Sequence, residues 1–144
     1  MEYYIFSNYY ENHEPQSCFS KTFVSLWDGW LGQENLHKLD QVSEAEWHRF
    51  NDWLRELTRN FSVYVPDFEQ QALKPVDNVE LLLVDFQSSQ NKTSDQFIRL
   101  VIPELECIIT EDWDYTYIVW HKNNGAVEML EPMIQKAGLK RFSE

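Results

Sequence analysis

Hydrophobic residues recur at helical spacing over residues 43–60 and define the clearest element of the chain. Ser43 and Glu46 form the capping-box pattern, in which the hydroxyl and the carboxylate satisfy free N–H groups of a first helical turn. The apolar face that follows carries Trp47, Phe50, Leu54 and Leu57. Charged residues occupy the opposite face, so the pattern predicts an amphipathic surface helix.

In the C-terminal half, apolar and polar side chains alternate along the chain, and this alternation indicates a β-hairpin. Residues 105–109 and 115–121 are rich in β-branched and aromatic side chains, and the loop between them is Glu111-Asp-Trp-Asp114. Alternation puts one set of side chains, Leu105, Cys107 and Ile109, on a single face, and places Glu104, Glu106, Ile108 and Thr110 on the other. Because the second strand is apolar on both faces, we expect it near the centre of the sheet.

The remaining apolar segments complete the expected fold. Residues 20–31 have aromatic residues at helical spacing and predict a short helix, whereas the apolar run over 79–86 predicts a buried strand. Residues 126–137 predict a last helix, which Pro132 kinks or begins and Gly138 ends, before an edge strand over 139–142. The sum is an α+β fold: a mostly antiparallel sheet with a C-terminal β-hairpin and two or three packed helices.

Length and composition favour one domain spanning residues 1–144. The 144 residues are 43% hydrophobic and 15% aromatic, which is enough to form a core. No run of 18 apolar residues occurs, and the N-terminus lacks the basic and apolar regions of a signal peptide. We therefore expect no membrane association and a cytoplasmic location.

The net negative charge of the chain limits which kinds of molecule are expected to bind it. Acidic residues outnumber basic ones by 24 to 12, which gives a net charge of −12. Nucleic acids and anionic membranes both select for clusters of lysine and arginine, so neither is expected as a direct ligand. A protein partner that is itself basic fits this charge.

Motifs for catalysis or for a cofactor are missing from the sequence. It contains no glycine-rich phosphate loop, no nucleophile elbow and no metal-type spacing among its four histidines. Cys107 could act as a nucleophile with His121 as its base, but an apolar run and the neighbouring Glu106 disfavour the thiolate. We therefore expect no catalytic residue, no cofactor and no metal.

The stretch from Glu104 to Asp114 contains five carboxylates next to aromatic side chains and is the candidate site. Carboxylates and aromatic rings together suit a surface that binds a basic protein, because aromatic side chains dominate interface energetics. The predicted partner-binding residues are Glu104, Glu106, Glu111, Asp112, Trp113, Asp114, Tyr115 and Tyr117. Three alternatives stay open: a small metal-binding or hydrolytic enzyme that uses the carboxylates of residues 104–114, an acidic nucleic-acid mimic of the phage type, and a solvated loop without function.

The C-terminal half also resembles a known group of proteins. Residues 102–120, I-P-E-L-E-C-I-I-T-E-D-W-D-Y-T-Y-I-V-W, and then L-E-P-M-I-Q-K-A-G-L, are similar to the C-terminal part of small acidic immunity proteins from bacterial polymorphic-toxin systems, including contact-dependent growth inhibition. The resemblance covers residues 97–142. It implies a cytosolic, non-enzymatic α+β protein that binds and neutralises one cognate toxin, often a nuclease.

Overall fold

The architecture is an antiparallel sheet packed against helices. The computed structural model describes residues 5–89, 92–93, 96–112 and 115–143. A seven-stranded sheet has the order β5-β4-β6-β7-β8-β3-β9, with every neighbouring pair antiparallel, and β1 pairs with β2 in a small second sheet. The strands are β1 Tyr10–Glu11, β2 Glu14–Pro15, β3 Ser20–Ser25, β4 Tyr64–Asp67, β5 Ala72–Pro75, β6 Arg99–Ile102, β7 Cys107–Asp112, β8 Thr116–His121 and β9 Lys140–Phe142.

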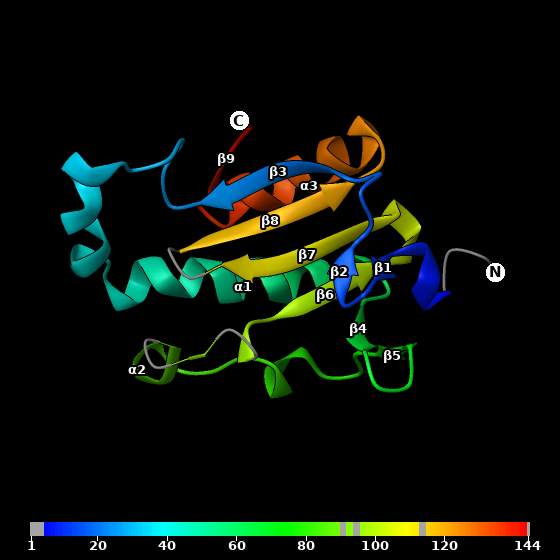
Figure 1. The fold of residues 1–144 in the computed structure, drawn as a ribbon. Helices are drawn as coiled ribbons and strands as arrows, with labels where there is room; N and C mark the ends of the chain where they lie inside the picture. Colours follow the sequence, from blue (N-terminus) through cyan, green and yellow to red (C-terminus); the bar gives the residue numbers. More distant parts are fainter. Residues whose placement is uncertain (1–4, 90–91, 94–95, 113–114, 144) are drawn as a thin grey trace.

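The helices cover one face of the large sheet. Figure 1 shows the two long helices behind the strands, while the N-terminal segment with β1 and β2 lies in front of them. The α-helices are α1 Glu44–Asn60, α2 Phe86–Ser89 and α3 Asn124–Lys136. The 3-10 segments are η2 Phe6–Asn8, η3 Gln33–Gln41, η4 Val79–Leu81 and η6 Pro103–Leu105. The predicted α+β fold with its mostly antiparallel sheet is thereby confirmed.

Helix α1 begins and packs as its sequence pattern predicts. The Ser43 Oγ accepts a hydrogen bond from the Glu46 N–H at 3.1 Å, and the Glu46 carboxylate accepts one from the Ser43 N–H at 3.1 Å. Burying an apolar helical face against a sheet stabilises the fold by about 25 cal/mol for each Å² removed from water. The buried positions of α1 are Trp47, Phe50, Asn51, Trp53, Leu54 and Leu57.

The β7–β8 hairpin occupies the middle of the sheet, as predicted. Its register pairs Cys107 with His121 at one end and Asp112 with Thr116 at the other. Cys107 and Ile109 enter the main core between the sheet and the helices, whereas Ile108 faces a second core beneath the N-terminal segment. Both faces of β7 are therefore covered, which explains its apolar sequence.

The helix predicted over residues 20–31 is wrong. Residues Ser20–Ser25 form β3, which pairs with β8 on one side and with β9 on the other. Thr22, Phe23 and Val24 favour extended backbone, and two neighbouring strands satisfy their backbone hydrogen bonds. The helical spacing of the aromatic residues in this segment was a coincidence of composition.

The buried strand predicted over residues 79–86 is also wrong. The segment begins as η4, where the Asn78 side chain accepts a hydrogen bond from the Glu80 N–H at 3.1 Å. Leu81 is 83% exposed, so the apolar run does not mark a core strand. Arg55 of α1 donates to both carboxylate oxygens of Glu80, at 2.8 and 2.9 Å, and fastens the segment across the helix instead.

Helix α3 ends where Gly138 was expected to stop it. Gly138 has φ +80°, and the N–H groups of Gly138 and Leu139 bond to the carbonyls of Gln135 and Ile134, which is the Schellman arrangement. The helix continues on both sides of Pro132, so this proline does not mark its first turn. The strand β9 then follows at the sheet edge as predicted.

The length and the apolar character of the helices show whether any of them could cross a membrane. Within the described ranges, no helix combines the length and the apolar character that crossing a bilayer requires.

Candidate functional site

The predicted carboxylates divide between the two ends of β7. Glu104 lies in η6 and accepts a hydrogen bond from the Ser62 N–H at 2.6 Å. Glu106 follows in left-handed backbone at φ +49°, with its carboxylate 3.9 Å from the Lys122 ammonium. Asp112 ends β7, six residues and thus roughly 20 Å of strand away from Glu106. Catalytic carboxylate pairs lie about 5–10 Å apart, so this strand does not bring the two groups into one catalytic pair.

Glu111 has an internal partner. Its carboxylate accepts a hydrogen bond from the Lys92 ammonium at 2.8 Å and another from the Ile98 N–H at 2.9 Å. The side chains of Lys92 and Glu111 are only 9% and 13% exposed. The Glu111 carboxylate therefore ties the segment before β6 to the end of the hairpin. It is mostly buried, whereas the sequence analysis expected it on a partner-binding surface.

The two tyrosines of the candidate site differ in their surroundings. Tyr117 is 5% exposed and packs against Phe50 and Trp53, with ring centroids 5.3 and 5.8 Å away. Burial, and secondarily the Glu111 carboxylate, raises the pKa of Tyr117 well above its ordinary value. Tyr115 is half-buried in left-handed backbone at φ +58°, with its ring edge-on to Trp27. The Tyr117 ring thus belongs to the core, whereas Tyr115 reaches the surface. Trp113 and Asp114 lie outside the described residues.

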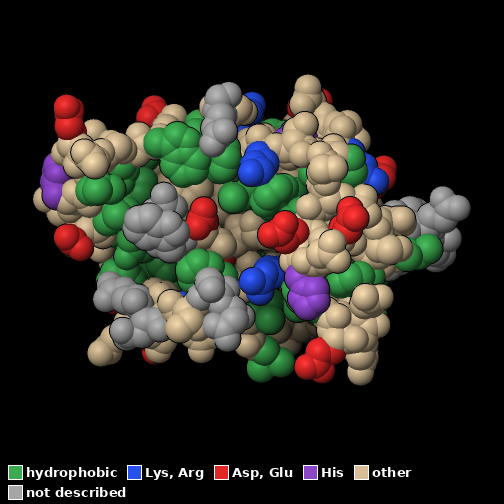
Figure 2. Space-filling model, in the orientation of Figure 1, with side chains coloured by type: hydrophobic (Ala, Val, Ile, Leu, Met, Phe, Trp, Pro, Cys, Tyr) green, Lys and Arg blue, Asp and Glu red, His purple; other side chains and the backbone are tan. Residues whose placement is uncertain are grey.

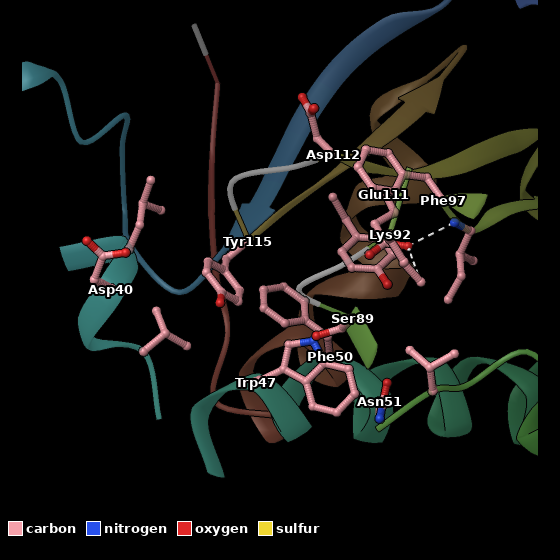
Figure 3. Close-up of a pocket in the computed structure, with 15 residues that line it drawn as sticks. Asp40, Trp47, Phe50, Asn51, Ser89, Lys92, Phe97, Glu111, Asp112 and Tyr115 are labelled. Atoms are coloured by element: carbon pink, nitrogen blue, oxygen red, sulfur yellow. Dashed lines mark hydrogen bonds and ion pairs between the residues drawn. The ribbon is translucent and has the colours of Figure 1, made fainter. Parts of the chain in front are cut away.

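A pocket of about 560 Å³ opens between α1 and the Asp112 end of the hairpin. Figure 3 shows it bounded by η3, α1, the segment around Lys92 and the strands β7 and β8. Aromatic rings form much of its wall. The lining residues are Leu39, Asp40, Val42, Trp47, Phe50, Asn51, Val84, Ser89, Lys92, Phe97, Ile98, Glu111, Asp112, Tyr115 and Tyr117.

The charge of this pocket is negative. Among its described lining residues, Asp40, Glu111 and Asp112 carry carboxylates and Lys92 carries an ammonium group. Lys92 pairs with Glu111, at a distance of 2.8 Å between Nζ and Oε1. Asp40 comes from η3 and Asp112 from β7, and Tyr115 lies between them in the view of Figure 3.

Asn51 is one of the polar pocket residues that sequence reasoning missed, together with Asp40, Ser89 and Lys92. It is 5% exposed, and its side-chain amide makes no hydrogen bond with any residue in the described part of the chain. Its amide atoms are not sealed from solvent, because they open onto the pocket, where water can hydrogen-bond to them. A signal was present in the sequence: Asn51 follows Trp47 by four residues and so falls within the apolar face of the helix.

The opposite face of the sheet gives a different picture. Figure 2 shows acidic side chains set singly among hydrophobic and basic ones over the strands. No continuous acidic patch is visible on this face. Acidic residues of this strongly acidic chain, whose net charge is −12, therefore lie closer together at the pocket than on the face shown in Figure 2.

The geometry of Cys107 and His121 bears on the nucleophile alternative. Cys107 is fully buried, and burial raises the pKa of its thiol to about 12. Nε2 of His121 lies 2.9 Å from the Thr22 hydroxyl, and Nδ1 lies 3.1 Å from the Asn123 carbonyl oxygen. Both ring nitrogens thus have partners that link β8 to β3 and to the start of α3, and the thiolate is suppressed.

Among the residues that the structure describes, no group of three or more histidine, cysteine, aspartate or glutamate side chains could hold a metal ion. Comparisons of the chain with protein-family models, with curated proteins and with solved structures find no match. The similarity to immunity proteins accordingly stays an expectation from the sequence.

Proposed function

We propose that this protein is a non-enzymatic inhibitor that binds a basic protein, namely a cognate toxin domain of the nuclease type. The observation that carries the proposal is the acidic, aromatic pocket at the Asp112 end of the hairpin. Carboxylates beside rigid rings suit a cationic protein surface, because the charges speed encounter and the rings supply contact area. A strongly acidic chain also reproduces the charge that a nuclease surface is built to meet.

The supporting physical argument concerns pre-organisation. Tyr117, Phe50 and Trp47 are fixed by core packing, and the Lys92–Glu111 ion pair holds the neighbouring segment against the hairpin. A partner that binds here orders few additional side chains, so less conformational entropy is lost on association. This rigid base favours a binding surface that keeps its shape.

The experiment is co-expression with the product of the adjacent gene, followed by growth assays and calorimetry on the purified components. We expect protection from the toxin and a nanomolar complex whose association slows as salt is added. Failure to protect cells, together with the absence of nanomolar binding, would refute the proposal.

A matched pair of variants locates the contact. Asp112→Lys reverses a charge at the pocket, while Asp52→Lys reverses one on the exposed side of α1. We expect the first to reduce the association rate by about tenfold and the second to change it by less than about twofold. Equal effects of the two variants would place the interface elsewhere.

A further inference from the structure

We propose that the edge strand β9 binds an extended segment of a partner protein, which adds to the sheet as a further strand. The segment carries a large apolar side chain and, two residues away on the same face, a carboxylate. This surface is separate from the acidic pocket, and the inference does not depend on the proposed function. Three features carry it: an unpaired backbone edge, a half-exposed tryptophan and a lysine that forms no ion pair with a described residue.

The backbone of β9 is paired on one side. Its residues, Lys140–Phe142, pair with β3, and Figure 1 shows β9 at one margin of the sheet and β5 at the other. Within the described ranges, no backbone hydrogen bond outside the sheet involves these three residues. An unpaired edge is a template for an added strand, because its outward N–H and C=O groups need partners. The opposite edge, β5, ends in Pro75, which has no N–H to offer.

An aromatic cluster lies beside this edge. Trp30 packs edge-on against Phe23 of β3 and Phe142 of β9, with ring centroids 4.7 and 5.0 Å away. Phe23 is 3% exposed, whereas Trp30 is 49% exposed. Figure 2 shows hydrophobic side chains gathered at the upper left of this face, where Figure 1 places β9 and the end of β3. A side chain opposite Phe142 in an added strand lies next to this cluster, where a large apolar group can cover part of the exposed ring.

The charge of the edge favours an acidic segment. Lys140 is exposed and forms no ion pair with a described residue, while Arg141 is paired with Glu131 of α3. Lys140 and Phe142 are two residues apart, so their side chains point to the same face of the sheet. The residues opposite them in an added strand are also two apart, whichever way that strand runs. A carboxylate opposite Lys140 and an apolar group opposite Phe142 therefore define the segment.

A second copy of the chain fits this edge poorly. If two β9 strands paired antiparallel about their centres, Arg141 would face Arg141 and Lys140 would face Phe142. Like charges opposite each other destabilise strand pairing, and Lys140 would find no carboxylate. The complementary occupant is therefore a different strand, one that supplies an acidic residue.

The test uses the whole chain and a short peptide in place of the partner. The ¹⁵N-labelled protein is titrated with N-acetyl-Thr-Ile-Thr-Glu-Thr-amide and, in parallel, with the same peptide carrying lysine in place of glutamate. We expect millimolar binding of the glutamate peptide, with slower amide hydrogen exchange in β9 and the largest indole shift at Trp30. The lysine peptide should bind about tenfold more weakly, because it places like charges opposite each other.

A charge swap separates a binding role from a structural one. Lys140→Glu changes an exposed side chain and should reverse the preference, so that the lysine peptide binds about tenfold more tightly than the glutamate peptide. Lys74→Glu is the matched control, because Lys74 is an exposed lysine of the other edge strand, and it should leave both affinities within about twofold. Trp30→Ala should weaken both peptides by about threefold or more, since it removes the exposed ring.

The result decides the role of the β9 edge separately from the proposed function, because the experiment contains no toxin. Absence of binding, equal binding of the two peptides to the wild type, shifts gathered away from β9, or equal effects of Lys140→Glu and Lys74→Glu would overturn the proposal. Protection of β9 that rises with protein concentration in the absence of peptide would identify a second copy as the occupant and would overturn it too. A toxin complex that forms while the peptide does not bind leaves only the added strand wrong.

Discussion

The Lys92–Glu111 ion pair joins fold stability to the pocket, and replacing Lys92 by methionine tests its strength. Methionine keeps most of the aliphatic length of the side chain and removes only the charge. The change leaves the Glu111 carboxylate, 13% exposed, with the Ile98 N–H at 2.9 Å as its remaining recorded donor. A charge that loses its partner while it stays buried destabilises a fold more than the pair itself had stabilised it.

The size of the effect follows from distance and burial. At 2.8 Å and an effective dielectric constant of about 20, the gross attraction is roughly 6 kcal/mol, most of which is offset by the desolvation of both groups. Exposed pairs contribute about 0–1 kcal/mol, and removing one partner of a fully buried pair costs about 3–5 kcal/mol. With exposures of 9% and 13%, we expect Lys92→Met to lower the free energy of unfolding by about 2–4 kcal/mol.

A double-mutant cycle in urea measures this directly. Glu111→Gln retains an oxygen for the Ile98 N–H, so the double variant Lys92→Met/Glu111→Gln should cost less than about 1 kcal/mol, and the coupling should exceed about 1.5 kcal/mol. Lys122→Met is the control, since its carboxylate partner is 3.9 Å away and half-exposed, and it should change stability by less than about 0.5 kcal/mol. A cost for Lys92→Met no larger than that of the control, or additive single effects, would refute the reasoning.

Three further predictions concern the rest of the fold. Ser43→Ala should cost about 1 kcal/mol in urea unfolding, because it removes the hydroxyl that caps α1, and an unchanged midpoint would contradict the capping role. Leu130→Ala should cost about 2–5 kcal/mol since Leu130 is fully buried, while Leu81→Ala, at a position 83% exposed, should stay within about 0.5 kcal/mol; similar losses for both would contradict the packing. The raised pKa of the Cys107 thiol, about 12, means that the unfolded chain releases this proton at lower pH than the folded chain. The stability contributed by the protonated thiol is therefore complete below about pH 8.5 and is lost as pH rises toward 12. In the wild type at pH 8, a thiol reagent should label only the exposed Cys18 until urea unfolds the protein, and early labelling of Cys107 would contradict its burial.

Sequence patterns correctly predicted the helix and the hairpin, whose formation depends on residues close together in the chain. The helix over 43–60 and the hairpin were correct because the capping box and the alternation act within the segments themselves. The segments 20–31 and 79–86 were wrong because pairing decides them. Residues 20–25 gain two neighbouring strands, while the apolar run at 79–86 finds none and lies over α1 instead.

The candidate site shows a similar division. Alternation correctly placed Ile109 on the core face, and extending the same period by two residues puts Glu111 on that face as well. Glu111 pairs with Tyr117 across the hairpin, so both point into the protein, and the sequence analysis ended the strand too early to see this. Its partner Lys92 could not be predicted, because the contact spans 19 residues of chain without a regular pattern.

Asn51 and Lys92 affect the stability of the free protein in opposite directions. A leucine at position 51 would suit the apolar face of α1 better than an amide without a partner, so we expect Asn51→Leu to unfold at higher urea concentration than the wild type. Lys92→Met should lower stability while leaving the Glu111 carboxylate in the pocket without its ammonium partner, and so should tighten the binding of a basic protein partner. A residue that serves only the fold would change stability and binding in the same direction. For Asn51, a polar group that a ligand can satisfy destabilises the free protein, whereas for Lys92 the ion pair stabilises the fold and neutralises a carboxylate that a cationic partner would otherwise meet.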